Sequence, residues 1–558
     1  MRNHLITHLL ATTLLLVLIL PGCQCGETEN KDDDPAQPRI ENADELIPSK
    51  DALAFFYMDV KSLSEAMEFN QPAPWREVAI IQELLAMGSE DPVIQHLIED
   101  LFSEGIQDGK VIGSIGFTNN ILQLYNGSQS EEGLAEEWHK LLSFDVAVVS
   151  TSIPLLVNAL MAEGVLEASN ATPKNQYGFH TQSIEDVTIG WCDTILMISS
   201  LSTGQLGKPH KENLGSFAHH KELSSHEASI LFNLPVGLSK SLTRAIPLLG
   251  TMVPDLTIPN GMERMIIDLI EGFDFIMYSA DVEDSSLRLA TEVQLDPSSK
   301  YAQIVFSSCD GLSPIELPLR KVSPIDDNML YGFGNVCLDY LEALDKEYDY
   351  FNGIQSLQEG LKSLTNEDPI SAMINIPDQE IKSLYKDLTG EYAFSFNADE
   401  NGMHFNLFVG MNSMLSEGIQ EELEGMLSLM ALIGILPPES TTINYTDDGI
   451  YLVSGRFAED IEDFKGKKWP QYPHVTKEHS IGCGAIDVFG LIETFGYAED
   501  YSSAQPFEEL LGNLELELLS DASTARSSAT LEWKINRDNT NADQGTLWVL
   551  LSPLLDEL

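Results

Sequence analysis

The sequence predicts an α+β protein of two related units, each an antiparallel sheet with helices packed on one side. Two observations support this fold class. Four landmarks made of strands and hairpins occur in the first half of the chain and recur in the same order in the second half. A loop with several prolines between residues 314 and 324 separates the halves. We therefore expect unit 1 at residues 46–300, a linker at 301–325, unit 2 at 326–540, and a C-terminal tail or short helix at 541–558.

The first landmark is a strand that runs into a helix. Residues 53–60 are apolar and favour a strand, and the helix-forming residues 63–66 follow them. Residues 330–336, followed by 340–343, repeat this pattern. Each unit is therefore expected to begin with a strand and a helix.

The second and third landmarks are a hairpin and a strand. The hairpin expected at 184–199 corresponds to one at 442–454, where an Asp-Asp-Gly sequence is a strong turn signal. The third landmark matches 229–234 with 484–489, and both segments follow a loop that contains histidine. After the first of these strands, the apolar segment at 238–273 favours helices with breaks at Pro247, Pro254 and Pro259.

The fourth landmark closes each unit with a hairpin, at residues 275–293 and 516–535. Side chains alternate along its last strand, with one face formed by Leu287, Leu289, Thr291 and Val293 and the other by Arg288 and Glu292. A half-buried antiparallel strand has this alternation. Hairpins resemble one another in unrelated proteins, so the shared order of all four landmarks is what indicates a duplication.

The charge of the chain excludes several partners. Its 558 residues include 31 Lys+Arg and 87 Asp+Glu, which gives a formal net charge of −56. A nucleic-acid-binding protein needs a basic surface for the phosphates, and so does a protein attracted to an anionic membrane. We therefore expect no nucleic-acid partner and no electrostatic attraction of the whole protein to an anionic membrane surface.

The N-terminus has the pattern of a secretory signal. A positive start precedes an apolar run at residues 9–20, which is too short to span a membrane as a helix. The following Leu-Pro-Gly-Cys at 20–23 resembles the lipobox of bacterial lipoproteins, except that Pro21 replaces the usual small residue. The resemblance implies a signal peptide at residues 1–22 and acylation of Cys23. The alternative is an ordinary cleaved signal followed by a chance cysteine.

The same resemblance implies a location. Gln24, not Asp, follows Cys23, a pattern that in proteobacterial lipoproteins favours export to the outer membrane. Residues 23–45 are acidic and contain proline, so we expect a flexible tether that joins the protein to the membrane through its N-terminal lipid. Residues 51–60 resemble the start of bacterial exported proteins built from duplicated strand–helix–hairpin units. That likeness indicates a place in the bacterial cell envelope and supplies no catalytic residues.

Cysteines are sparse. The chain has 6 of them and no CxxC pair. Cys192 and Cys483 lie in apolar, strand-like runs and are expected to be buried thiols. Cys309 and Cys337 form the one pair that we would test as a disulfide.

A search for reaction chemistry finds no established motif. The sequence has no GxSxG elbow, no HExxH zinc motif, no P-loop and no GxGxxG turn. Histidines and glutamates precede the third landmark of each unit and are candidate metal ligands, although their spacing matches no established site: His219, His220, His226, His474 and His479. We therefore predict no cofactor and a non-catalytic binding or structural role, with an unknown envelope partner or ligand.

Two alternative functions stay open. Residues 430–436 are hydrophobic on all sides, which indicates burial between sheet and helices or the lining of a site for a hydrophobic ligand. In the second case the protein is a carrier or sensor of that ligand. The other alternative is a hydrolase whose catalytic groups come from distant positions, because such a site leaves no motif.

Overall fold

The structure is a computed structural model that describes part of the chain. The described residues are 43–59, 62, 109–117, 142–162, 164, 166–167, 174–184, 187–200, 203–252, 259–283, 286–307, 330–354, 356, 387–399, 402–415, 417–418, 420–421, 423–425, 441–454, 480–488, 490 and 511–535. The signal peptide, Cys23, most of the tether, the apolar segment at 430–436 and the C-terminal tail lie outside them. Among the described helices, none combines the length and apolar character that a membrane crossing requires.

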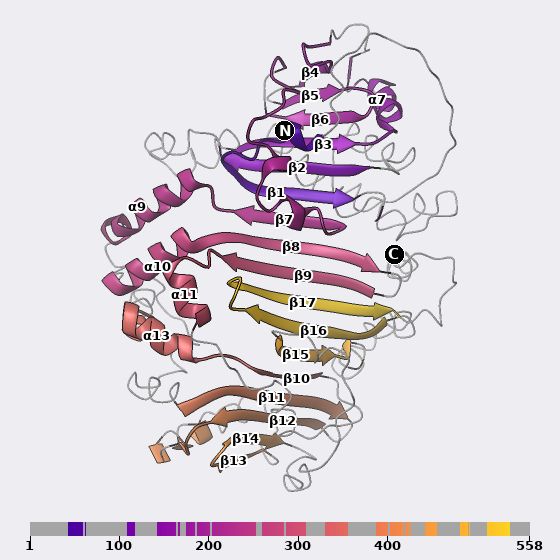
Figure 1. Cartoon of the computed structure of the whole chain (residues 1–558). Helices are drawn as coiled ribbons and strands as arrows, with labels where there is room; N and C mark the ends of the chain where they lie inside the picture. The colour runs from indigo at the N-terminus through magenta and orange to yellow at the C-terminus, as the bar shows by residue number, and fades with distance from the viewer. Residues whose placement is uncertain are drawn as a thin grey trace.

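The described strands form one sheet of 17 strands, and every pair of neighbours is antiparallel (Figure 1). From one edge to the other, the pairings give the order β4 (His180–Ile184), β5 (Val187–Trp191), β6 (Ile195–Ser199), β3 (Leu142–Val149), β2 (Lys110–Phe117), β1 (Ala52–Asp59), β7 (Ala228–Asn233), β8 (Phe273–Glu283), β9 (Ser286–Leu295), β17 (Arg526–Ile535), β16 (Leu511–Asp521), β15 (Ser480–Ile486), β10 (Leu330–Asn335), β11 (Leu388–Asp399), β12 (Gly402–Met411), β14 (Gly449–Ser454) and β13 (Thr442–Thr446).

The expectation of two separate sheets is wrong, because β9 and β17 join the two halves of the chain into one sheet. These two strands pair over their length, with Ala290 opposite Thr530 near the middle. Each strand would otherwise end its half with a free edge, and pairing satisfies the backbone hydrogen bonds of both edges. The antiparallel character and the mixture of strands and helices are as expected.

The strands of the two halves are arranged in the same order. In the first half, β6, β3, β2, β1, β7, β8 and β9 are successive neighbours. In the second half, β14, β12, β11, β10, β15, β16 and β17 follow one another in the same way. The hairpins expected at the second and fourth landmarks are present in both halves.

The largest apolar core described in the first half covers one face of its strands. It includes Phe55, Ile112, Leu231, Phe275 and Met277, all with no exposed surface. Leu46, Leu214 and Leu223 belong to the same core. They come from three short helices: η1 (Ala43–Leu46), η4 (Leu214–Ser216) and α8 (His220–Leu223).

Longer helices gather beside one end of the central strands (Figure 1). Helix α10 (Asn260–Gly272) contacts α9 (Val236–Met252), α11 (Lys300–Ser307) and α13 (Asp339–Tyr348). Helix α7 (Ile153–Ala162) lies near the opposite side of the first half. The predicted helical break at Pro247 is wrong, because α9 continues through this proline. The predicted break at Pro259 is confirmed, because α10 begins directly after this residue. Pro254 lies outside the described residues. Helix α11 occupies the start of the segment expected as a linker.

The described cysteines agree with part of the sequence interpretation. Cys192 and Cys483 are free thiols, the first partly exposed and the second buried. Cys337 is disulfide-bonded, and its partner lies outside the described residues. Pairing with Cys309 therefore stays a prediction.

Candidate functional site

Polar side chains gather on one face of the central strands β8, β9 and β17, where the sheet meets the segment that contains α8. The segment contributes His219 and His226, and strand β8 contributes Asp274 and Asp281. Residues directly opposite in antiparallel strands point to the same face, so Arg526 of β17 shares this face with Gln294 of β9. We treat this polar face as the candidate functional site.

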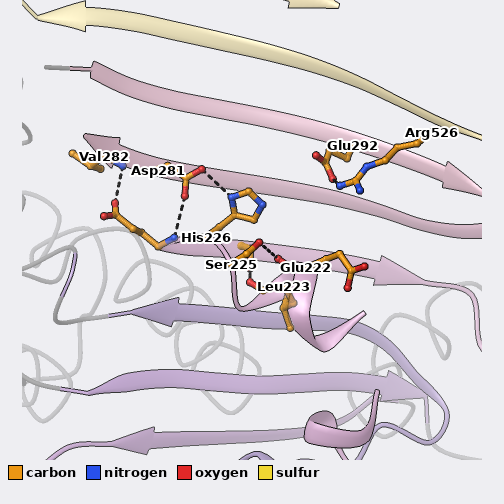
Figure 2. Close-up of polar contacts among 10 residues, drawn as sticks. Glu222, Leu223, Ser225, His226, Asp281, Val282, Glu292 and Arg526 are labelled. Carbon is orange, nitrogen blue, oxygen red and sulfur yellow. Dashed lines mark hydrogen bonds and ion pairs between the residues drawn. The ribbon is translucent and has the colours of Figure 1, made fainter. Parts of the chain in front are cut away.

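His226 and Asp281 form the shorter of the two His–Asp pairs of the site. The Nδ1 atom of His226 lies 2.8 Å from Oδ2 of Asp281, and the backbone N–H of Glu227 donates to Oδ1 of the same carboxylate over 3.2 Å. In return, the backbone N–H of Val282 donates to Oε2 of Glu227 over 2.6 Å. Figure 2 shows that these contacts join the end of the α8 segment to the end of β8. Burial alone would raise the pKa of Asp281. Its hydrogen bonds with His226 and with the backbone of Glu227, together with the nearby Arg288, lower the pKa below its ordinary value.

His219 makes a second pair near the other end of β8. Its Nε2 atom lies 3.0 Å from Oδ1 of Asp274, and the side-chain amide of Gln294 donates to the other carboxylate oxygen over 3.3 Å. The imidazole also packs between the rings of Phe217 and Phe275, with centroid distances of 5.5 and 4.7 Å. The hydrogen bond with Asp274 raises the pKa of His219, and partial burial only partly offsets this effect.

Arg526 and Glu292 form an ion pair between the two halves of the chain. Figure 2 shows the guanidinium of Arg526, from β17, directed at the carboxylate of Glu292, from β9. The two side chains are 33% and 16% exposed, so water screens the pair only partly. The pair thus adds a side-chain contact to the backbone hydrogen bonds of the junction.

The three histidines predicted as metal candidates in the first half lie beside different carboxylates. Nε2 of His220 is 3.3 Å from Asp44, which also accepts a hydrogen bond of 2.8 Å from Lys110. His219 and His226 have Asp274 and Asp281 as partners. In the described part of the chain, no group of three or more His, Cys, Asp or Glu residues could hold a metal ion. His474 and His479 lie outside that part.

The serine hydroxyls beside His226 are directed at backbone carbonyls. Ser225 donates to the carbonyl of Glu222 over 2.7 Å (Figure 2). Ser229 donates to the carbonyl of Leu223 over 2.6 Å. A serine nucleophile needs a hydrogen bond from its hydroxyl to the imidazole. In this arrangement the His–Asp pairs hold the α8 segment against the sheet.

A buried carboxyl that the sequence interpretation missed lies in the core of the first half. Asp145 of β3 is 3% exposed and accepts a hydrogen bond from the hydroxyl of Ser199. Burial raises the pKa of Asp145 to about 7, although the hydrogen bond opposes this shift. The available signal was a lone acidic residue in the otherwise uncharged run at 142–149.

The opposite face of the same central strands is apolar and exposed. Tyr278 is 49% exposed and Leu289 is 46% exposed, while Phe232 and Leu531 are 40% and 36% exposed. Leu289 and Leu531 are direct partners across β9 and β17. The ring of Phe232 lies 6.2 Å from that of Tyr278, edge to face. We call these four side chains, which lie on four adjacent strands, the apolar stripe.

Comparisons with known proteins add little. No family model matches the chain, and no curated protein matches it. Crystal form IV of TP0453 is similar over 48% of this chain and 85% of its own, with 10% identity and a TM-score of 0.24. Crystal form I of TP0453 covers 76% of this chain and 98% of its own, with 10% identity and a TM-score of 0.16. Scores this low support no inference.

Proposed function

We propose that the chain is a lipid-anchored protein of the bacterial cell envelope that binds a partner and catalyses no reaction. The apolar stripe is the observation that carries this proposal. On the polar face of the central strands, His219, His226 and Arg526 each lie beside a carboxylate. On the other face, large apolar side chains remain exposed. A monomeric soluble protein rarely leaves a sizeable apolar patch exposed without a binding role.

The strand arrangement supports an origin by duplication of one unit. The two halves share the order of their strands, and equivalent last strands, β9 and β17, pair at the centre. Antiparallel pairing of equivalent strands is the arrangement that a two-fold relation between the halves requires. The proposed units are those predicted from the sequence, except that α11 crosses the predicted end of unit 1 at residue 300.

A second candidate function, carriage of a hydrophobic ligand, also draws on the apolar stripe. An extended exposed face favours contact with a surface, whereas a small ligand is usually enclosed in a concave site. The hydrolase interpretation has less support, because Ser225 and Ser229 bond to backbone carbonyls instead of the neighbouring imidazole.

Acylation of Cys23 tests the proposed anchor. The full chain would be expressed in a bacterium that processes lipoproteins, and its N-terminal peptide analysed by mass spectrometry. We expect a peptide that begins at Cys23 and carries acyl chains, with the protein in the outer-membrane fraction. The N-terminal peptide of the Cys23→Ser variant should carry no acyl chain. A wild-type chain without an acyl group on Cys23 would contradict the anchor.

A further inference from the structure

The apolar stripe crosses the centre of the sheet diagonally. Tyr278 is one diagonal step from Phe232, since its direct partner in β7 is Ile230. Leu289 is one diagonal step from Tyr278, and Leu531 lies directly opposite Leu289. Neighbouring strands are about 4.8 Å apart, so the stripe spans roughly 14 Å across four strands.

Partly exposed apolar side chains widen the stripe. Alternate residues on the same face are Ile276 and Val293 in the first half and Leu516 and Trp533 in the second. The charged residues of these strands, including Arg288, Glu292, Arg526 and Glu532, alternate onto the other face. The stripe is therefore an uncharged surface on a chain whose net charge is −56.

The charge of the chain selects among possible occupants. A second copy would bring another charge of −56 against the first, and an anionic bilayer would repel the protein in the same way. A zwitterionic bilayer adds no net charge and offers apolar surface below its headgroups. Tyr278 and Trp533 suit that boundary, because tyrosine and tryptophan rings have an apolar body and a polar end.

The expected position of the anchor also favours the bilayer. Described structure begins at Ala43, nine residues before the start of β1, and β1 is three strands from β9. About 20 residues separate Cys23 from Ala43, and a chain of that length reaches at most about 70 Å. An acylated Cys23 would thus hold the apolar stripe within reach of the membrane.

We propose that the apolar stripe is a docking surface for zwitterionic lipid in the membrane that carries the lipid anchor. The proposal rests on the proposed function for its membrane, but contact through the stripe needs no acyl group. Insertion of Phe232, Tyr278, Leu289 and Leu531 into the headgroup region removes their exposed apolar surface from water. The sheet would lie against the membrane, with the His–Asp pairs on the face directed away from it.

Flotation on vesicles tests this contact without the anchor. The mature chain from residue 23, carrying Cys23→Ser, would be mixed with phosphatidylcholine vesicles and centrifuged through a density gradient. We expect the chain to float, and the double variant Leu289→Glu with Leu531→Glu to lower the ratio of bound to free protein on the order of tenfold or more. Phosphatidylglycerol vesicles at low salt should bind the chain more weakly than phosphatidylcholine vesicles.

Matched controls use exposed apolar side chains away from the stripe. Leu155 in α7 and Met414 after β12 are 52% and 54% exposed, and their change to glutamate should leave flotation unchanged. Thermal unfolding checks that each variant folds. If the double variant does not fold, Tyr278→Asp replaces it as the stripe variant. Failure of the Cys23→Ser chain to float, or equal flotation of stripe and control variants, would overturn the proposal. Self-association that the stripe variant abolishes would also overturn it, in favour of a second copy.

Flotation and acylation can fail independently. If the unlipidated chain floats but Cys23 is not acylated in cells, the docking surface is supported and the proposed anchor is contradicted. If Cys23 is acylated but the unlipidated chain does not float, the anchor is supported and the docking surface is contradicted.

Discussion

Asp145 and Asn406 occupy corresponding places in the two halves of the sheet. Asp145 in β3 lies directly opposite Ser114 in β2, and Asn406 in β12 lies directly opposite Ser395 in β11. Both side chains are buried, at 3% and 0% exposure. One half thus has an ionisable carboxyl where the other has a neutral amide of nearly the same shape.

This difference predicts that Asp145 makes stability fall as pH rises. An aspartate carboxyl in water has an ordinary pKa of 3.8, and the fold raises the pKa of Asp145 to about 7. Folding therefore favours the protonated form. Its stabilising contribution is complete below pH 3.8 and is lost progressively up to about pH 7, where the loss is on the order of 4 kcal/mol.

The Asp145→Asn variant should remove this pH dependence. Its amide oxygen can still accept the hydrogen bond from Ser199, and Asn406 shows that the fold accommodates an amide at the corresponding place. We expect the variant to be more stable than the wild type at pH 8 by a few kcal/mol and of similar stability near pH 4. Denaturant unfolding at the two values measures this, and an unchanged slope with pH would contradict it.

His219 and Asp274 predict a second, smaller pH effect. The hydrogen bond between them raises the pKa of His219 above 6.5. Its stabilising contribution is therefore complete below pH 6.5 and is lost as pH rises through the higher value of the folded state. We expect His219→Gln to cost on the order of 1 kcal/mol at pH 6 and clearly less at pH 9.

The measurement for His219 uses the Asp145→Asn background, because Asp145 titrates in an overlapping range. Asp274→Asn is the matched variant and should remove the same pH dependence as His219→Gln. If the double variant loses twice as much as either single variant, the two side chains act separately and the pairing is wrong.

Sequence patterns predicted the local elements better than the contacts between them. Alternation from Leu287 to Val293 predicted strand β9 and its two faces. It did not predict that Leu289 is exposed while Ala290 is buried, because this depends on which parts of the chain cover each face. Likewise, a local pattern does not show that the last strand of one half pairs with the last strand of the other. The sequence therefore predicted two sheets where the structure has one.

The candidate site shows the same division between local and distant information. The histidine-rich loop drew attention to His219 and His226, but their partners Asp274 and Asp281 are each 55 residues further along the chain. The clustering of histidines in the loop therefore indicated metal ligands. In the structure, each of these two imidazoles instead lies beside one aspartate from strand β8.

Arg526 and Glu292 predict a measurable coupling between the two halves. Both single variants, Arg526→Met and Glu292→Gln, remove the ion pair and keep side chains of similar length. A double-mutant cycle of unfolding free energies should give a coupling of about 1 kcal/mol, which decreases at high salt. Lys534 and Glu515, 3.1 Å apart within the second half, provide a control cycle whose pair does not cross the junction. A coupling near zero for Arg526 and Glu292 would show that this ion pair adds nothing to the stability of the junction.

The disulfide of Cys337 predicts a covalent constraint at the start of the second half. Cys337 lies two residues after the end of strand β10, so its disulfide ties the end of this strand to another part of the chain. With Cys309 as that partner, the closed loop has about 28 residues, and its loss should destabilise the protein by roughly 2–4 kcal/mol. Peptide mapping without reduction should recover a linked peptide that contains Cys309 and Cys337. Cys309→Ser and Cys337→Ser should then destabilise the protein equally, and the double variant should cost no more than either one. A linked peptide that joins Cys337 to another cysteine would contradict this pairing and place the constraint elsewhere in the chain.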